Sequence, residues 1–324
     1  MTSSRAATAA PEATHRRRWA VPIIAWAGVG AVALLLQAWF LGRWVLDGGL
    51  RAGADTGYTI SPVRAAIAWG FQAFLAVTLV AVTVKLLRDC RRAHAVTLMA
   101  ALFVGWVLCF WQSPLVNYRQ LTFAPSRYAP NVSSWGPYLP GWDPPQRELL
   151  VESLMNPGIL CYGLMILWPW LQQIITSRLA GKRPYWGLAR LMGASVLAAV
   201  VLDILLESAW ISTGLYTFPT SLHALSLFGG HWYQLPLPVA LNVALTVSSP
   251  IVFMQQYAKR HGTTVHIFRG SEHYGPRAQG WLRILAGIGM TNVQMTAYVI
   301  VNLLFGYLGT DPIPADTPSY LWPL

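Results

Sequence analysis

Charged residues are scarce in this chain of 324 residues. Asp, Glu, Lys and Arg together account for 11% of the sequence, whereas hydrophobic residues account for 55%. A soluble domain carries about 25% charged residues, so the shortage argues against a water-soluble globular protein. The formal net charge of +11 could suggest a nucleic-acid partner, but the basic residues are distributed along the chain as the flanks of membrane spans are. No nucleic-acid partner is therefore expected.

Cysteine and lysine are also rare, with three residues of each. The cysteines are unclustered and show neither a disulfide framework nor the spacing of metal ligands. A retinal-binding protein needs a lysine in its last membrane span to form a Schiff base. The lysines are Lys85, Lys182 and Lys259, and none of them falls in the last apolar segment. The sequence therefore does not fit a retinal-binding protein.

Motifs for phosphate and metal binding are missing as well. A magnesium-dependent prenyltransferase needs Asp-rich clusters on two helices, and here there is one D-x-x-x-E. No segment resembles a P-loop or a dinucleotide-binding fingerprint. A metal site built from Asp203, Glu207, His223 and His231 is chemically possible, but their spacing gives it no specific support. We expect neither a metal ion nor an organic cofactor.

Long apolar runs are what the sequence has in abundance. Seven of them reach the roughly 20 residues that a membrane-spanning helix needs. They cover about residues 20–46, 63–87, 95–115, 157–177, 187–212, 233–257 and 283–306. This pattern predicts an all-α polytopic membrane protein of about seven transmembrane helices. No internal repeat is visible, so we expect one helical transmembrane domain, residues 19–324, behind a disordered basic tail, residues 1–18.

The basic residues favour one orientation in the membrane. With a cytoplasmic N-terminus, six of the 23 Lys and Arg residues lie on or near the outer side, namely Arg43, Arg51, Arg64, Arg119, Arg127 and Arg147. The others flank the inner ends of the spans, as the positive-inside rule requires. We therefore expect a multi-pass protein of the cell membrane with its N-terminus in the cytoplasm and its C-terminus outside. Membrane lipid is the natural partner of the excess positive charge.

One hydrophilic connection, residues 116–156, is unusually long. It contains six prolines, together with the aromatic residues Tyr118, Phe123, Tyr128, Trp135, Tyr138 and Trp142. A connection of this length without regular periodicity is usually a functional lid or a disordered linker. The aromatic content argues against disorder. The segment therefore predicts a folded, aromatic- and proline-rich cap over the outer mouth of the bundle.

Two acidic residues interrupt the fifth apolar run, VLAAVVLDILLESAWIST. Asp203 and Glu207 are four residues apart and so lie one turn apart on the same face of a helix. That face cannot contact lipid, because an ionised carboxylate in hydrocarbon costs several kcal/mol or more; such residues often mark a functional site. One carboxyl of a close pair can serve as a neutral acid while its neighbour serves as an ionised base. Asp203 and Glu207 are therefore the candidate catalytic residues.

Further polar and aromatic side chains are expected near the same outer mouth. The candidates for substrate contact are Asn117, Tyr118, Trp135, Tyr138, Trp142, His223, His231 and Tyr233. A structural alternative stays open for each of them. The carboxyl pair could bond to polar groups on neighbouring helices, each bond contributing about 0.6 to 2 kcal/mol. The loop aromatics could anchor the chain at the membrane interface.

The chain also resembles a known family. The order of the seven spans, the segment VNYRQLTFAPSRYAPNVSSWGPYLPGW, the helix DILLESAW with the following STGLYTFP, and HWYQLPLP together resemble the AveC-type spirocyclases of actinobacterial polyketide pathways. The resemblance extends over most of the chain from about residue 20. It implies an integral membrane enzyme of macrolide antibiotic biosynthesis, acting on a hydrophobic polyketide. Such enzymes close two hydroxyls onto one ketone to form a spiroketal, and some also act as dehydratases on the ring.

The resemblance brings no catalytic motif with it, so residue roles follow from the chemistry. Asp203 and Glu207 are expected to supply the proton transfers of spiroketal closure. Trp135, Tyr138 and Trp142 are expected to exclude water, which would compete with the second hydroxyl. The alternative is a non-catalytic protein, a proton-coupled transporter or a lipid-binding membrane protein, in which the carboxyls carry protons. Transporters often contain inverted repeats, and none is visible here.

Overall fold

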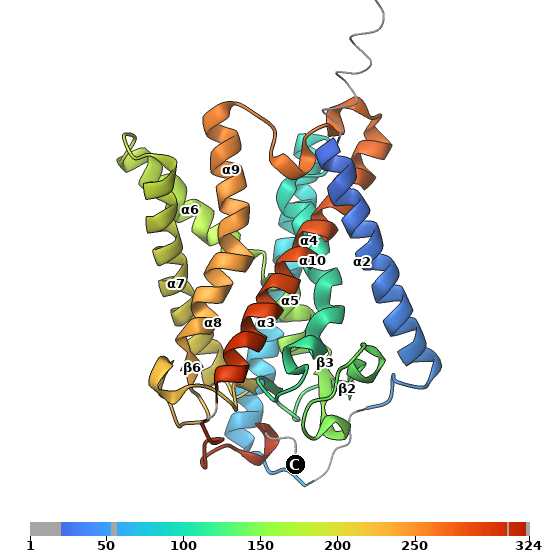
Figure 1. The fold of residues 1–324 in the computed structure, drawn as a ribbon, viewed down its shortest axis with the longest axis vertical. Helices are drawn as coiled ribbons and strands as arrows, with labels where there is room; N and C mark the ends of the chain where they lie inside the picture. The colour runs from blue at the N-terminus through green and yellow to red at the C-terminus, as the bar shows by residue number, and fades with distance from the viewer. Residues whose placement is uncertain (1–20, 53–56, 310, 322–324) are drawn as a thin grey trace, which may run out of the picture.

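The structure is a computed structural model that describes residues 21–52, 57–309 and 311–321. Seven helical segments in this part of the chain are long and apolar enough to cross a membrane, and they stand side by side as a bundle (Figure 1). Their bounds are Val21–Leu46, Pro62–Ala93, Leu98–Asn117, Met155–Lys182, Leu188–Ser212, Leu237–His261 and Pro276–Leu308. The prediction of an all-α polytopic membrane protein is confirmed. The predicted tail, residues 1–18, lies outside the described residues.

The second and seventh spans are longer than the apolar runs predicted. Helix α3 (Pro62–Ala93) begins with Ser61 as its N-cap, whose hydroxyl accepts the Arg64 N–H, and has Pro62 at its first position. Proline is favoured there because its missing N–H has no partner in the first turn anyway. Helix α10 (Pro276–Leu308) also starts with a proline. The additional residues include polar ones and lie mainly at the C-terminal end of α3, residues 88–93, and at the N-terminal end of α10, residues 276–282.

Three of the spans are interrupted helices. Helix α4 (Leu98–Leu108) continues as the 3₁₀ segment η1 (Cys109–Asn117), which contains Pro114. The fourth span consists of η4 (Met155–Ile159), α5 (Leu160–Leu164) and α6 (Leu167–Lys182). The sixth consists of α8 (Leu237–Asn242), the π segment η6 (Val243–Ser248) and α9 (Ser249–His261). Irregular backbone at membrane depth requires cover by protein or water, so these breaks mark segments that face the bundle interior.

Helix α10 is packed closely by α2 (Val21–Leu46) and by α4, and glycines permit this approach. A Cβ atom added at Gly289 of α10 would lie 2.3 Å from the Trp26 carbonyl oxygen of α2. One added at Gly287 would lie 2.4 Å from the Ala101 carbonyl oxygen of α4. Small residues at such crossings let backbones approach within van der Waals contact, which drives helix association in membranes.

The seven segments alternate in direction, so their connections gather at two ends (Figure 1). The connections after α2, after η1 and after α7 (Leu188–Ser212) meet the chain that follows α10 at one end, which we call the cap end. The connections after α3, α6 and α9 lie at the opposite end. Most of the basic residues flank this opposite end, as the sequence predicted. Which end faces the cytoplasm stays a prediction.

The cap end is a folded layer built from three short antiparallel strand pairs. Strand β2 (Asn131–Ser133) pairs with β3 (Val151–Ser153), and β5 (Ser226–Leu227) pairs with β6 (Leu235–Pro236). Strand β1 (Ala124–Pro125) pairs with β4 (Tyr216–Thr217), and so joins the long connection to the segment after α7. Four one-turn 3₁₀ helices complete this layer in the described part of the chain: η2 (Gly136–Tyr138), η3 (Arg147–Leu149), η5 (His223–Leu225) and η9 (Ser319–Leu321). The predicted cap is thus an ordered part of the fold.

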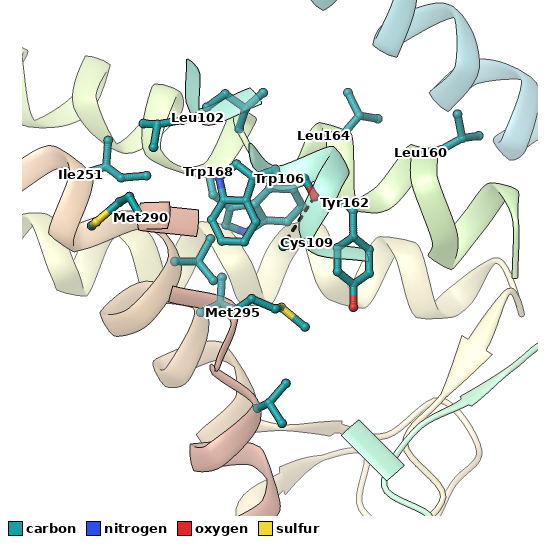
Figure 2. Close-up of a cluster of buried hydrophobic side chains, with 14 of the residues drawn as sticks. Leu102, Trp106, Cys109, Leu160, Tyr162, Leu164, Trp168, Ile251, Met290 and Met295 are labelled. Atoms are coloured by element: carbon teal, nitrogen blue, oxygen red, sulfur yellow. Dashed lines mark hydrogen bonds between the residues drawn. The ribbon is translucent and has the colours of Figure 1, made fainter. Parts of the chain in front are cut away.

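A large apolar core fills the middle of the bundle (Figure 2). Trp106 of α4 is fully buried there. The Cys109 thiol donates a hydrogen bond to the backbone carbonyl oxygen of Trp106 at 3.1 Å. The same core contains Tyr162 and Trp168 from the fourth span and Trp210 and Ile211 from α7. The core therefore adjoins the helix that carries the two candidate carboxyls.

Candidate functional site

Asp203 and Glu207 lie one turn apart on α7 and line the same cavity. Asp203 is fully buried and Glu207 is half-buried. The cavity has a free volume of about 80 Å³, which is below the roughly 300–1,000 Å³ of a typical small-molecule pocket. It therefore admits the reacting part of a large ligand rather than the whole molecule.

Asp203 is held by the indole of Trp168 on α6. The Trp168 Nε1–H donates a hydrogen bond of 2.5 Å to Asp203 Oδ1. The second oxygen, Oδ2, is buried and has no hydrogen-bond partner among the described residues. A buried polar atom without a partner is rare in native proteins and points to a functional role or to an absent ligand. This oxygen is thus available to a molecule in the cavity.

Glu207 is held from the cap by Tyr216 of β4. The Tyr216 hydroxyl donates a hydrogen bond of 2.6 Å to Glu207 Oε1. Burial, reinforced by the neighbouring Glu207 carboxylate, raises the pKa of the Tyr216 phenol well above its usual value. The phenol therefore remains a hydrogen-bond donor to Glu207 throughout the physiological pH range.

Neither carboxyl has a basic partner. Within the described part of the chain, no Lys, Arg or His side chain forms an ion pair with Asp203 or Glu207. Two uncompensated negative charges in an apolar cavity would be costly. An arrangement with one neutral and one ionised carboxyl avoids most of that cost. The site is therefore suited to giving and taking protons.

The remaining cavity wall is mainly aromatic and apolar. It comprises Ser113, Val116, Phe123, Pro157, Cys161, Tyr162, Met165, Trp168, Trp210, Tyr216, Phe218, Val243, Met295 and Tyr298. On the cap side the rings of Phe123, Tyr216 and Phe218 pack on one another, with centroids 5.0 to 5.9 Å apart. These three rings come from the two segments that β1 and β4 join. The strand pairing therefore closes the cavity at its cap end.

No three His, Cys, Asp or Glu side chains lie close enough together to hold a metal ion in residues 21–52, 57–309 and 311–321. Asp203 and Glu207 alone supply two carboxyls. The chemistry that they can perform with their own atoms is proton transfer and stabilisation of positive charge.

A family model for AveC-like spirocyclases matches residues 90–320 of the chain. The chain belongs to the AveC-like spirocyclase family. No curated protein and no solved structure matches it. The matched range includes every residue of the carboxylate cavity. Membership assigns this AveC-like protein a spiroketal-forming role in polyketide biosynthesis, and it confirms the resemblance drawn from the sequence.

Of the predicted site residues in this AveC-like protein, the cavity brings together only Asp203 and Glu207. The indoles of Trp135 and Trp142 are buried inside the cap and donate to the backbone carbonyls of Trp111 and Pro114, at 2.7 and 2.8 Å. These bonds fasten the cap to η1. Because both rings are enclosed by the cap, neither of them reaches the cavity.

The two predicted tyrosines of the long connection also have partners away from the cavity. The Tyr138 hydroxyl donates to Asp47 Oδ2 at 2.9 Å. The Tyr118 hydroxyl donates to the Pro140 carbonyl at 2.6 Å. Asn117 closes a turn, with its Nδ2 donating to the Phe123 carbonyl and its Oδ1 accepting the Phe123 N–H. These side chains shape the cap and do not line the carboxylate cavity.

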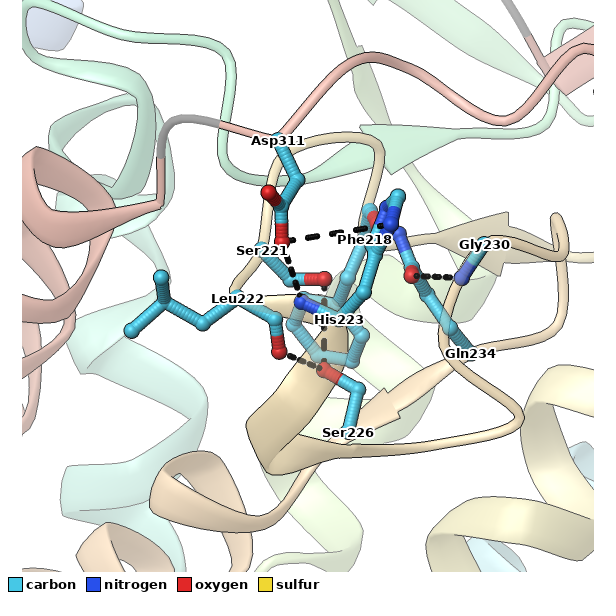
Figure 3. A network of polar contacts seen from close by, with 8 residues as sticks. All are labelled: Phe218, Ser221, Leu222, His223, Ser226, Gly230, Gln234 and Asp311. Carbon is cyan, nitrogen blue, oxygen red and sulfur yellow. Dashed lines mark hydrogen bonds and ion pairs between the residues drawn. The ribbon is translucent and has the colours of Figure 1, made fainter.

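The predicted histidines lie in the segment between β4 and α8. Figure 3 shows His223 with its partner Asp311. The His223 backbone N–H donates to Asp311 Oδ2 at 2.6 Å, and its ring Nδ1 is 3.9 Å from the same oxygen. His231 is exposed, lies 3.0 Å from Asp316 and stacks on Tyr233. These contacts tie the segment to the chain that follows α10. None of the three predicted side chains lines the cavity, so their contact with substrate stays a prediction.

Sequence reasoning missed Trp168 and Tyr216, the two donors to the acid pair. Trp168 falls inside an apolar run rather than at its end, and a buried indole N–H needs a hydrogen-bond acceptor. That requirement could have predicted a polar partner for Trp168 inside the bundle. Tyr216 follows Glu207 by nine residues, but only the pairing of β4 with β1 turns its hydroxyl towards the carboxyl.

Proposed function

We propose that this protein closes two hydroxyl groups of a polyketide onto one ketone, with Asp203 and Glu207 as the acid–base pair. The observation that carries the proposal is the buried, unpartnered Asp203 Oδ2 beside Glu207 in one aromatic cavity without a basic residue. Asp203, the more buried of the two, is the neutral acid. Glu207, which accepts the Tyr216 hydroxyl, is the ionised base.

The first step forms a hemiketal. One substrate hydroxyl attacks the ketone carbon, and its proton passes to the Glu207 carboxylate. The ketone oxygen takes the proton of the Asp203 carboxyl and becomes a hydroxyl. At the end of this step Asp203 is ionised and Glu207 is neutral, so the pair has exchanged roles without net gain or loss of protons.

The second step forms the spiroketal and releases water. Glu207 returns its proton to the hemiketal hydroxyl, which leaves as water and creates an oxocarbenium ion. The ionised Asp203 stabilises this cation and then takes the proton of the second hydroxyl as that oxygen bonds to the carbon. The pair is then back in its starting state, and the overall reaction loses one molecule of water.

The aromatic wall supports this chemistry in two ways. Trp168 and Trp210 line the cavity, and the face of an aromatic ring favours a nearby cation. The packed rings of Phe123, Tyr216 and Phe218 exclude water from the cavity, the role that the sequence analysis expected of Trp135, Tyr138 and Trp142. Since the cavity admits only part of a large ligand, the remainder of the polyketide lies outside it, in the apolar surroundings that the membrane provides.

Dehydration of a ring hydroxyl would use the same two carboxyls. Asp203 would protonate the departing hydroxyl, and Glu207 would remove a proton from the adjacent carbon. A purified protein that lowers the mass of a hydroxylated spiroketal by one further water would demonstrate this second activity. If the hydroxylated spiroketal is recovered unchanged, the activity is cyclisation alone.

The experiment that tests the proposal measures stereoselective closure by the purified protein. Spontaneous closure of a dihydroxyketone gives the mixture set by thermodynamics, so the readout is the excess of one spiroketal stereoisomer. Asp203→Asn and Glu207→Gln should each lower this rate about 10² to 10⁴-fold. Asp89→Asn is the matched control, because Asp89 is a carboxylate on a spanning helix that pairs with Lys85 away from the cavity.

If both Asp203→Asn and Glu207→Gln close the ketone at the parental rate, the assignment of these residues as the acid–base pair is wrong. A transporter would behave differently from the enzyme in proteoliposomes. It would move the ketone across the bilayer unchanged, with a coupled proton flux.

A further inference from the structure

Another buried carboxyl lies in the cap next to the cavity. Glu152 of β3 is 6% exposed, and within the described residues it forms no ion pair. Burial raises its pKa to about 7, although hydrogen bonds from two serine hydroxyls oppose the rise. The proposed mechanism does not use this residue, so its retention in an apolar setting calls for another explanation.

The two serines each occupy one oxygen of Glu152. The Ser113 hydroxyl donates to Oε2 at 2.6 Å, and the Ser134 hydroxyl donates to Oε1 at 2.7 Å. Distances this short are typical of hydroxyls bound to an ionised carboxylate. When Glu152 is ionised, each serine therefore uses its only hydroxyl hydrogen in the hydrogen bond to this carboxylate.

The serines differ in what else they contact. The Ser134 oxygen also accepts the Gly136 N–H at 3.1 Å. Ser113 makes no second hydrogen bond within the described part of the chain, and it lines the carboxylate cavity whereas Ser134 does not. Ser113 thus presents unused acceptor lone pairs at the wall of the site, with its own proton turned away.

We infer that Ser113 accepts a hydrogen bond from a substrate hydroxyl, and that Glu152 is the positioning residue that fixes the orientation of Ser113. This inference rests on the proposed function. The hydroxyl that Ser113 holds is the one that waits while the other attacks the ketone. The group that binds at Ser113 is therefore a neutral alcohol whose O–H donates a hydrogen bond to the serine oxygen.

The orientation of Ser113 depends on the charge of Glu152. When Glu152 is protonated, it has a proton of its own to donate, and the Ser113 hydroxyl is released to turn towards the cavity. The elements β1, β2 and η4, which pack against β3, carry no titratable side chain. Among the described residues, the phenol of Tyr162 on α5 interacts electrostatically with Glu152. Binding of an alcohol at Ser113 should therefore weaken as the pH falls through about 7.

The test measures binding without turnover. The ligands are a nine-carbon alkane with a hydroxyl at each end, in which a methylene replaces the ketone, and the nine-carbon alcohol with one hydroxyl. Quenching of tryptophan fluorescence reports binding, since Trp168 and Trp210 border the cavity. Titrations of purified parental protein, Ser113→Ala and Ser134→Ala are compared at pH 8 and pH 6.

At pH 8 the parental protein and Ser134→Ala should bind the diol about threefold to tenfold more tightly than the mono-alcohol, the worth of one neutral hydrogen bond. Ser113→Ala should bind the two ligands equally. At pH 6 the preference of the parental protein should shrink, and in Glu152→Gln it should be weak at both pH values. A purely structural role for Glu152 predicts no change in this preference.

Equal behaviour of Ser113→Ala and Ser134→Ala, or failure of the folded parental protein to prefer the diol, would overturn the inference. The proposed function fails separately. The parental protein could show the serine-dependent preference and yet give no stereoisomeric excess from the dihydroxyketone. In that case the alcohol site would stand and the proposed catalytic function would be wrong.

Discussion

Trp168 Nε1 donates a 2.5 Å hydrogen bond to Asp203 Oδ1 across the contact between α6 and α7, two residues that are 35 positions apart in the chain. The bond occupies one carboxyl oxygen and leaves Oδ2 to face the cavity. It fixes the direction in which the proposed acid delivers its proton. The indole also lies against Trp210, with ring centroids 6.0 Å apart, so the donor is itself held in place.

Trp168→Phe should lower the rate of stereoselective closure about tenfold to a hundredfold. Phenylalanine keeps an aromatic ring at this position, but the hydrogen bond that stabilises Asp203 once it has given up its proton, worth about 1.5 to 3 kcal/mol for a charged group, is lost. Initial rates measured over a range of ketone concentrations should place the loss in kcat. Trp170→Phe is the control on the same helix, because Trp170 is 39% exposed and does not line the cavity. Equal rates in the two variants would argue against the role of the Trp168 indole.

Tyr216→Phe should slow closure by a similar factor, because Glu207 loses the donor that stabilises its ionised form. The matched control is Tyr118→Phe, which removes a phenol that donates to the Pro140 carbonyl within the cap. Tyr118→Phe should leave kcat and KM unchanged. A raised KM in this control would instead support the sequence-based prediction that Tyr118 contacts the substrate.

Glu152 should make stability depend on pH. Because its pKa is about 7 in the folded protein and about 4.5 in the unfolded chain, the folded state binds more protons between these values. The contribution of Glu152 to stability is therefore full below pH 4.5 and declines as the pH rises to about 7, by about 3 kcal/mol in total. Denaturant unfolding in detergent should show this decline in the parental protein relative to Glu152→Gln. A constant difference between the two from pH 4.5 to 7.5 would contradict the prediction.

Gly289→Ala should disrupt the crossing of α2 and α10. The added Cβ would lie 2.3 Å from the Trp26 carbonyl oxygen, so the two helices would have to separate. We expect a loss of about 1 to 3 kcal/mol, as for other overpacked sites, seen as a lower unfolding midpoint in detergent. Gly280→Ala on the same helix is the control, since its Cβ would make an ordinary contact of 3.7 Å with Val96. Equal midpoints for the two variants would show that this helix crossing can relax.

Membrane orientation can be tested with reporters. A reporter inserted after Arg183, between α6 and α7, and one fused to the C-terminus should be found on opposite sides of the membrane, because Arg183 lies at the end away from the cap. The positive-inside rule places Arg183 in the cytoplasm. Both reporters on one side would contradict the alternation of the seven spans.

The sequence predicted the seven spans and the inward orientation of Asp203 and Glu207, because both are local properties of the chain. The length of an apolar run decides whether a helix can cross the membrane, and this length depends only on residues that are consecutive in the sequence. A spacing of four residues puts Asp203 and Glu207 on one face of α7, and the cost of a carboxylate in lipid turns that face inward. The structure agrees, with Asp203 fully buried at the cavity wall.

The partners of these carboxyls were decided by tertiary structure alone. Trp168 reaches Asp203 from α6, 35 residues away along the chain, and Tyr216 reaches Glu207 from the cap, nine residues away. Their hydrogen bonds depend on how far each helix is rotated and on which strands pair, and sequence spacing does not encode either. For the same reason, Trp135 and Trp142, which the sequence analysis named as candidates for substrate contact, are buried in the cap and bond to η1, whereas Trp168 was not singled out. The chain sequence determined the bundle and its two acids, and only packing across the bundle determined what those acids touch.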